Sequence, residues 1–220
     1  MTNSVDMIYF QELAEQDPKD VCRRTLCKYD DKNKFYTLSV WGDEYAVYPH
    51  KFKIDRITNN FQSSHDLFHL FIIYYLLKSK EIEISNEWIS EKDIPGGVTF
   101  FRGPHEWISE KDIPGGVTFF RGPHKIPTHL ISNKYSNNIK EFRKRCEQLH
   151  GIPLDMADAA YSFKITSHIS VAVLYWAGDD DFPPESKILY DKTITEHLAS
   201  DILFALAVEI CKKIGSQHVG

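Results

Sequence analysis

The sequence has few cysteines and no long apolar segment. The first absence argues against cysteine-based metal or redox motifs, and the second argues against a membrane-spanning helix. Its four cysteines, Cys22, Cys27, Cys146 and Cys211, form no CxxC pair, so neither a zinc knuckle nor a thioredoxin-like CxxC redox motif is indicated. The longest apolar run, LFHLFIIYYLL, is about half as long as a membrane-spanning helix needs to be. The first residues, MTNSVDMIYF, lack the basic flank and apolar core of an export signal. We therefore expect a cytoplasmic protein that does not enter a membrane.

The chain also lacks an excess of basic charge. Its 26 lysines and arginines against 31 aspartates and glutamates give a net charge of −5, which argues against binding nucleic acid through its phosphates. Hydrophobic residues make up 42% of the 220 residues and charged residues 26%, as in a globular protein. No stretch rich in proline, glycine or serine divides the chain. We therefore expect one globular domain over residues 1–220.

One stretch of nineteen residues occurs twice without a single difference. Residues 87–105 (copy one) and 106–124 (copy two) both read EWISEKDIPGGVTFFRGPH. The Pro-Gly-Gly sequence breaks a helix, and an odd number of added residues would turn the buried face of a strand outward. Lengthening a surface loop costs only about 0.6 kcal/mol per doubling of its length. We therefore expect one copy to loop out of a monomer, with a domain-swapped dimer as the alternative. The sequence leaves open which copy takes the native place, and whether the duplication is natural, engineered or an artefact.

Hydrophobic periodicity predicts helices and strands in an α+β order. The strand-like runs gather in two groups that helices separate, which favours a mixed or mainly antiparallel sheet packed against helices over a βαβ array. A turn at Gly42 and Asp43 is expected to join the first two strands, and the repeat is expected to be loop and short strand. The expected helices are 6–15, 18–26, 65–77, 136–150 and 194–214, and the expected strands are 35–41, 44–48, 52–54, 160–165, 169–176 and 188–190.

Two patterns of basic and imidazole side chains are candidates for a site. His65 and His69 lie four residues apart and share one helix face, as two metal ligands do. Their helix reads as core, so we expect no metal and keep this pair as the alternative. Arg121 and His124 follow a Gly-Gly pair, where glycine lets a ligand approach the backbone and arginine offers a fork for an anion.

The richest group of carboxylates lies in the second half of the chain. It comprises Asp155, Asp158, residues 179–181, Glu185 and Asp191. These acids lack the alternating spacing of a calcium loop, and consecutive acids beside proline are usually solvated. The sequence also lacks GxGxxG, a Walker loop and GxSxG, so no catalytic motif identifies a reaction.

The second half also carries a resemblance to a known family. The segments GGVTFFRGPHKIPTHL, GIPLDMADAAYSF, ISVAVLYWAGDDDFPPESKILYD and HLASDILFALAVEI together resemble the uncharacterised DUF3786 family (domain of unknown function 3786) of bacterial and archaeal anaerobes. Its most specific part is W-x-G-D-x-x-F-P at Trp176 to Pro183, with Asp180 and Asp181 where the family signature usually has glutamate. The family has no established activity. Some members carry a neighbouring four-cysteine iron–sulfur domain, so the resemblance implies a link to redox or corrinoid metabolism.

These observations lead us to expect a ligand-binding or accessory module, tied by the resemblance to anaerobic redox or one-carbon metabolism. Its cofactor is not identified, and its partner is expected to be a small molecule or an iron–sulfur or corrinoid protein. One alternative is an enzyme that uses His124 or His129 for acid–base chemistry, and another is a structural or partner-binding subunit. Polar residues beside apolar strand ends, where pockets form, give the expected ligand-binding set: Arg121, His124, Asp158, Trp176, Asp179 and Asp191.

Overall fold

The structure is a computed structural model that describes residues 5–57, 66–82, 107–109, 111, 113 and 125–215. The chain forms two compact units, and each is assembled from separate parts of the sequence. Unit 1 comprises Met1–Glu83, Ile165–His168 and Thr195–Glu209, and unit 2 comprises Ile84–Lys164, Ile169–Ile194 and Ile210–Gly220. The chain therefore passes between the units more than once.

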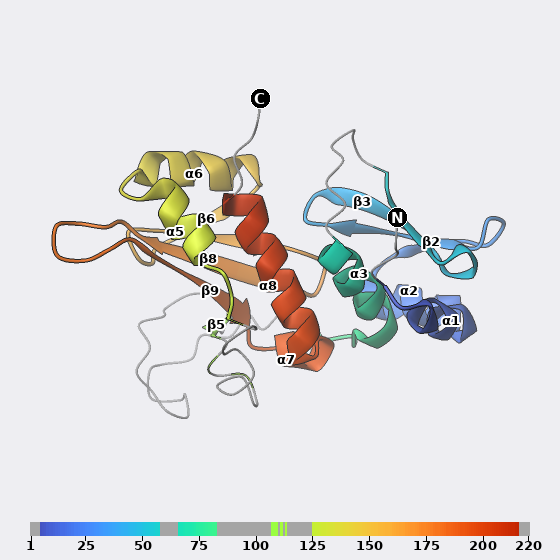
Figure 1. Ribbon diagram of the computed structural model, residues 1–220. Coiled ribbons are helices and arrows are strands. Elements are labelled where there is room, and N and C mark those ends of the chain that lie inside the picture. Colours follow the sequence, from blue (N-terminus) through green and yellow to red (C-terminus); the bar gives the residue numbers. More distant parts are fainter. Residues whose placement is uncertain are drawn as a thin grey trace. The chain divides into compact units, whose positions relative to one another are not determined.

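Unit 1 contains, within its described residues, a four-stranded antiparallel sheet of order β1-β2-β3-β4 (Figure 1). Its first two helices are capped by the preceding Asp6 and Asp17, whose carboxylates each accept a hydrogen bond from a backbone N–H of the first turn over 3.0 Å. The third helix packs against both of them and buries Phe71, Ile72 and Leu76 completely. The elements are α1 (Met7–Glu15), α2 (Pro18–Thr25), β1 (Lys28–Asp30), β2 (Phe35–Val40), β3 (Asp43–Tyr48), the 3-10 helix η1 (Pro49–Lys51), β4 (Lys53–Arg56) and α3 (Asp66–Lys78).

A two-residue turn joins β2 to β3. Val40 pairs with Asp43, so Trp41 and Gly42 form the turn, with φ angles of 49° and 80°. Positive φ at both positions is typical of a type I′ turn, and glycine adopts it without steric cost. Trp41 is only 5% exposed, and its N–H donates to the carbonyl of Ile165 over 2.7 Å. The turn expected at Gly42 and Asp43 is therefore wrong by one residue, because burial of the indole favours Trp41 over a small residue.

Unit 2 contains, within its described residues, a five-stranded antiparallel sheet of order β5-β9-β8-β7-β6. The helices α5 and α6 pack on β9 and β7 respectively, and Phe142 of α6 stacks on Tyr175 of the neighbouring strand β8 with ring centroids 4.7 Å apart. Along the central strand β8, Ser170 to Tyr175 are all buried. The elements are β5 (Trp107–Ile108), α5 (His129–Tyr135), α6 (Ile139–Gln148), β6 (Ile152–Leu154), β7 (Ala159–Lys164), β8 (Ser170–Trp176) and β9 (Glu185–Asp191) (Figure 1). Two helices, α7 (Ile194–His197) and α8 (Ser200–Gly215), follow β9.

Copy two of the repeat supplies the edge strand β5. Trp107 pairs with Asp191 and Ile108 with Tyr190, so this short strand lies on the edge of β9. Ser109 and Ile113, which follow it in copy two, are each 5% exposed. Copy one lies outside the described residues, and the expectation of a looped-out or swapped copy stays a prediction.

The α+β class with mainly antiparallel sheet is confirmed. The helix expected at 136–150 is present but shorter, as α6, and the helix α5 before it was not expected. The two helices are separated at Ser136, which has a positive φ of 46°, and Asn138 Oδ1 caps α6 by accepting from the N–H of Glu141 over 3.1 Å. The single helix expected at 194–214 is wrong, because the chain breaks between α7 and α8. No helix in the described part of the chain is both long enough and apolar enough to cross a membrane.

Candidate functional site

The loop between β8 and β9 contains the most specific sequence of the chain. Asp179 organises this loop, because its Oδ1 accepts from the backbone N–H of Asp181 over 2.9 Å and of Phe182 over 2.7 Å. The N–H of Asp179 in turn donates to the carbonyl of Phe182 over 2.9 Å. These bonds are those of an Asx-type turn, which needs a short side chain with an acceptor oxygen. The loop therefore has a defined shape around one carboxylate.

Close packing and a second carboxylate hold the base of the loop. A Cβ on Gly178 would lie 2.7 Å from Cδ of Pro184 and 3.1 Å from Oδ1 of Asn137, so only glycine fits without a shift. Asp158, which precedes β7, accepts from the N–H of Ala177 through Oδ2 over 2.9 Å. The strand end and the loop are thus connected by side chains from three segments of unit 2.

An arginine and a tyrosine fix the surroundings of Asp158. Nη2 of Arg143 donates to the backbone carbonyl of Asp158 over 3.0 Å. The hydroxyl of Tyr175 donates to the carbonyl of Ser136. Burial raises the pKa of Tyr175, and the charge of Asp158 adds to this effect. The phenol therefore stays neutral and joins the end of β8 to the turn before α6.

The loop presents an aromatic ring and acidic groups to solvent. Phe182 is 71% exposed, and the neighbouring Asp180 and Asp181 are exposed too. Trp176, at the start of the loop, is partly buried against the apolar cluster of Ala160, Ala172, Leu174 and Leu189. Phe182 is the most exposed of the large apolar side chains in the described part of the chain, and aromatic side chains are enriched at protein interfaces.

The structure brings together only some of the residues that the sequence predicts as a ligand site. Asp158, Trp176 and Asp179 lie at the same end of the sheet. Asp191 lies at the other end of β9, because Trp176 pairs with Glu185 and the six residues from there to Asp191 span about 20 Å. Arg121 and His124 lie outside the described residues, so a ligand-binding role for the whole set stays a prediction.

Asp191 is buried and forms hydrogen bonds within the turn that follows β9. Its side chain is 1% exposed, and Oδ1 accepts from the N–H and the hydroxyl of Thr193 over 2.9 and 2.6 Å. These bonds order the turn that follows β9.

The structure describes only some of the histidines that were predicted as candidate site residues. His69 is partly buried on α3, and His65 lies outside the described residues. His129 is exposed at the start of α5, whereas His124 is not described, so the acid–base alternative stays a prediction. Among the described residues, no three side chains of histidine, cysteine, aspartate or glutamate are placed to hold a metal ion.

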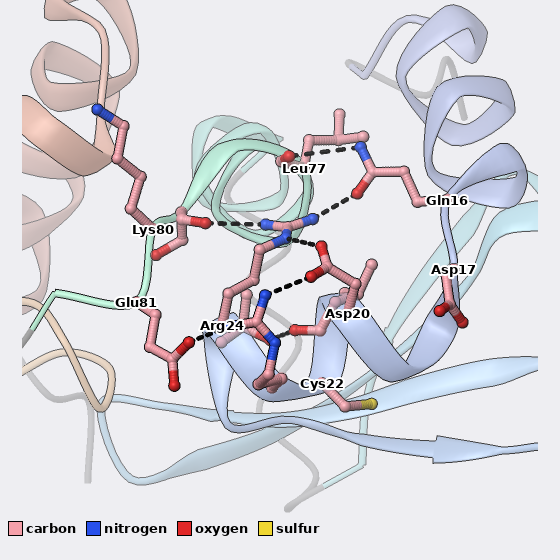
Figure 2. A network of polar contacts seen from close by, with 12 residues as sticks. Gln16, Asp17, Asp20, Cys22, Arg24, Leu77, Lys80 and Glu81 are labelled. Atoms are coloured by element: carbon pink, nitrogen blue, oxygen red, sulfur yellow. Dashed lines mark hydrogen bonds and ion pairs between the residues drawn. The ribbon is translucent and has the colours of Figure 1, made fainter.

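Unit 1 holds a buried polar network that sequence reasoning missed (Figure 2). Arg24 is 9% exposed; its Nε donates to Asp20 over 3.2 Å and its Nη1 to the carbonyl of Ser79 over 3.0 Å. Its Nη2 donates to the side-chain oxygen of Gln16, whose amide reaches the carbonyl of Leu77 over 3.4 Å. The guanidinium therefore joins α1, α2 and the end of α3. Nothing in the spacing of these residues could have predicted the contact, because they are up to 61 positions apart.

The same network continues to two buried histidines. The hydroxyl of Ser79 lies 2.9 Å from Nδ1 of His197, which also accepts from the N–H of Lys80 over 3.4 Å. The rings of His197 and His168 stack with centroids 6.0 Å apart and planes at 11°. Ser79 and His197 are 2% and 1% exposed, so a substrate has no direct access to this serine–histidine pair. We interpret the pair as part of the framework of unit 1.

The comparisons with known proteins bear out the resemblance. A family model described as a domain of unknown function, DUF3786, matches residues 17–106 and again residues 104–213. The two matches meet where copy one of the repeat ends and copy two begins. No curated protein and no solved structure matches the chain. Because the family model covers most of the sequence, the chain belongs to the DUF3786 family.

Proposed function

We propose that the chain is an accessory module that binds a partner protein through the loop 176–184, with Phe182 as the anchor. The observation that carries this proposal is the 71% exposure of Phe182 on a loop whose backbone is tied to the carboxylate of Asp179. A phenyl ring is poorly solvated by water, so burying this side chain in an interface contributes about 1.5–3 kcal/mol to the free energy of binding.

The order of the loop adds to the expected affinity. Binding normally costs the conformational entropy of the loop that becomes fixed. Here the bonds to Asp179 and the close packing of Gly178 already fix it in the free protein. The backbone that carries Phe182 is therefore ordered before any partner arrives.

The charge around Phe182 indicates what kind of surface the partner has. Asp180 and Asp181 directly precede Phe182 in the loop and are exposed, so a basic surface is complementary. Their attraction acts over about a Debye length of 8–10 Å at physiological salt, so added salt is expected to slow association. The family resemblance makes iron–sulfur and corrinoid proteins the first class of partner to test.

The test compares two exposed apolar residues of unit 2. Phe182→Ala removes the anchor, and Ile152→Ala, at 64% exposure on β6, is the matched control. Wild type and both variants are used to capture proteins, without air, from a lysate of the organism that encodes the chain. Affinities for the captured protein, once purified, are then measured by calorimetry at two salt concentrations.

We expect a protein that wild type and Ile152→Ala capture and that Phe182→Ala does not. Loss of the anchor should weaken binding by about 2 kcal/mol, which is roughly thirtyfold. Because Phe182 is exposed, its replacement should leave the melting temperature of the chain unchanged. Equal capture by all three proteins, or capture by none, would overturn the proposal.

A further inference from the structure

Two thiols of unit 1 lie side by side. The sulfur atoms of Cys22 and Cys27 are 3.5 Å apart. A disulfide bond needs about 2.05 Å between sulfurs, so the pair must close by roughly 1.5 Å, within the reach of a side-chain rotation. The other two cysteines, Cys146 and Cys211, are each fully buried.

The contact depends on how α2 ends. In a continuous helix, residues five apart point about 140° away from each other, because each residue turns by about 100°. Here α2 stops at Thr25, and Leu26 adopts the left-handed conformation with φ 55° and ψ 28°. This reversal directs Cys27 back toward the last helical turn, where Cys22 lies. Leu26 itself is 63% exposed, so burial of its side chain does not explain the turn.

The two thiols differ in access. Cys22 is partly exposed, and Figure 2 shows its sulfur on α2 directed away from the Arg24 guanidinium. Cys27 is 8% exposed. An incoming reagent therefore meets Cys22 first, and Cys27 stands behind it in the position of a resolving thiol.

We propose that Cys22 and Cys27 form a thiol–disulfide exchange site whose substrate is a small-molecule disulfide of the glutathione class. The thiolate of Cys22 attacks one sulfur of the reagent, its S–S bond breaks, and one thiolate leaves. Cys27 then attacks the Cys22 sulfur of the mixed disulfide, and the second thiolate leaves. The protein dithiol loses two electrons, the reagent disulfide gains them, and the two thiol protons end on the two released thiols.

Burial affects the second step. It raises the pKa of Cys27 to about 12, so this group is a neutral thiol at neutral pH. Resolution is therefore expected to be slower than the first attack, and to accelerate as the pH rises. The internal bond would close the turn between α2 and β1 covalently. In a reducing compartment the pair stays a dithiol until the glutathione pool becomes oxidised.

The test exposes the folded full chain to glutathione buffers of increasing oxidised fraction, followed by alkylation, intact mass and peptide mapping. Cys22→Ser and Cys27→Ser are the matched variants, and the buried Cys146 and Cys211 are internal references. We expect a Cys22–Cys27 disulfide that dithiothreitol reverses, with Cys146 and Cys211 unmodified until the chain is denatured. Cys27→Ser should trap glutathione on Cys22, roughly tenfold more than Cys22→Ser traps on Cys27.

Two results would overturn the proposal. One is a folded wild-type chain that keeps both thiols at every glutathione ratio. The other is equal trapping by the two serine variants, which would deny Cys22 its role as the attacking thiol. The wild-type peptide map stands by itself if either variant fails to fold. Neither result bears on the loop at Phe182, so this proposal and the proposed partner binding are tested separately.

Discussion

The identical repeats allow one residue to be tested against its own duplicate. Ile113 of copy two is 5% exposed and follows the edge strand β5. Ile94 occupies the same place in copy one, within the same nineteen residues. Deleting either copy leaves the same shortened sequence, so a deletion cannot distinguish them. A single substitution can, and we predict that Ile113→Ala destabilises the chain more than Ile94→Ala does.

The size of the effect follows from burial. Replacing a buried isoleucine by alanine costs about 2–5 kcal/mol, and a site beside a two-residue edge strand is expected near the lower end, at about 2–3 kcal/mol. For a chain of this length each kcal/mol lowers the melting temperature by about 2–4 °C. The edge of β9 accepts one strand, and the structure gives that place to copy two. The same change at Ile94 should therefore cost less than about 0.5 kcal/mol.

The assay is thermal and urea unfolding of wild type, both single variants and the double variant, monitored by circular dichroism. We expect a melting temperature lowered by about 5–10 °C for Ile113→Ala and hardly lowered for Ile94→Ala. A reversed order would show that copy one occupies the edge of β9. Small losses for both single variants with a large loss for the double variant would show that the copies exchange. Either result would refute the assignment of β5 to copy two.

Three further predictions concern single side chains. Arg24→Met should lower the free energy of unfolding by about 2–3 kcal/mol, because it removes several charge-assisted hydrogen bonds of a buried side chain. Arg23→Met, at a side chain that is 58% exposed, should change the free energy of unfolding by less than about 1 kcal/mol in the same urea titrations. Equal effects of the two variants would contradict the network. Gly178→Ala should lower the melting temperature of unit 2 and weaken capture through the loop, because its Cβ would lie 2.7 Å from Pro184, and an unchanged melting curve would refute this. Burial raises the pKa of Tyr45 to about 12, above its ordinary value near 10, so the neutral phenol stabilises the fold below pH 10 and this contribution is lost as the pH rises to 12. Wild type should therefore lose more stability than Tyr45→Phe between pH 10 and 12, and parallel melting profiles would contradict the assignment.

Much of the secondary structure was predictable because it depends on local pattern. The aspartates before α1 and α2 cap those helices, and alternating or continuous apolar runs mark β2, β3, β7 and β8. The errors occur where long-range contacts override local preference. Trp41 takes a turn position that favours small residues because the fold buries its ring. The strands β1 and β6 are too short to show a period, and they exist because β2 and β7 offer them an edge.

Only part of the candidate site could be predicted from the sequence. The signature at Trp176 to Pro183 identified the loop, and the structure shows why its aspartate and glycine are needed. Phe182, in contrast, is part of that signature, but only the structure shows that its side chain is exposed. Asp191 was grouped with the loop because both are acidic and near in sequence, yet the register of β8 and β9 places them at opposite ends of a strand.

Family membership, the α+β class, the repeat and the acidic loop are properties of the chain itself, because composition, periodicity and short-range spacing are written in the order of residues. The choice of copy two for β5, the burial of Arg24 against Ser79 and the approach of Cys22 to Cys27 arise from folding. Each depends on which groups meet after distant segments pack or the chain reverses direction, and on how much water they lose there. A single sequence does not show which distant residues will lie close together or how deeply they will be buried. Only the tertiary structure therefore decided these three features.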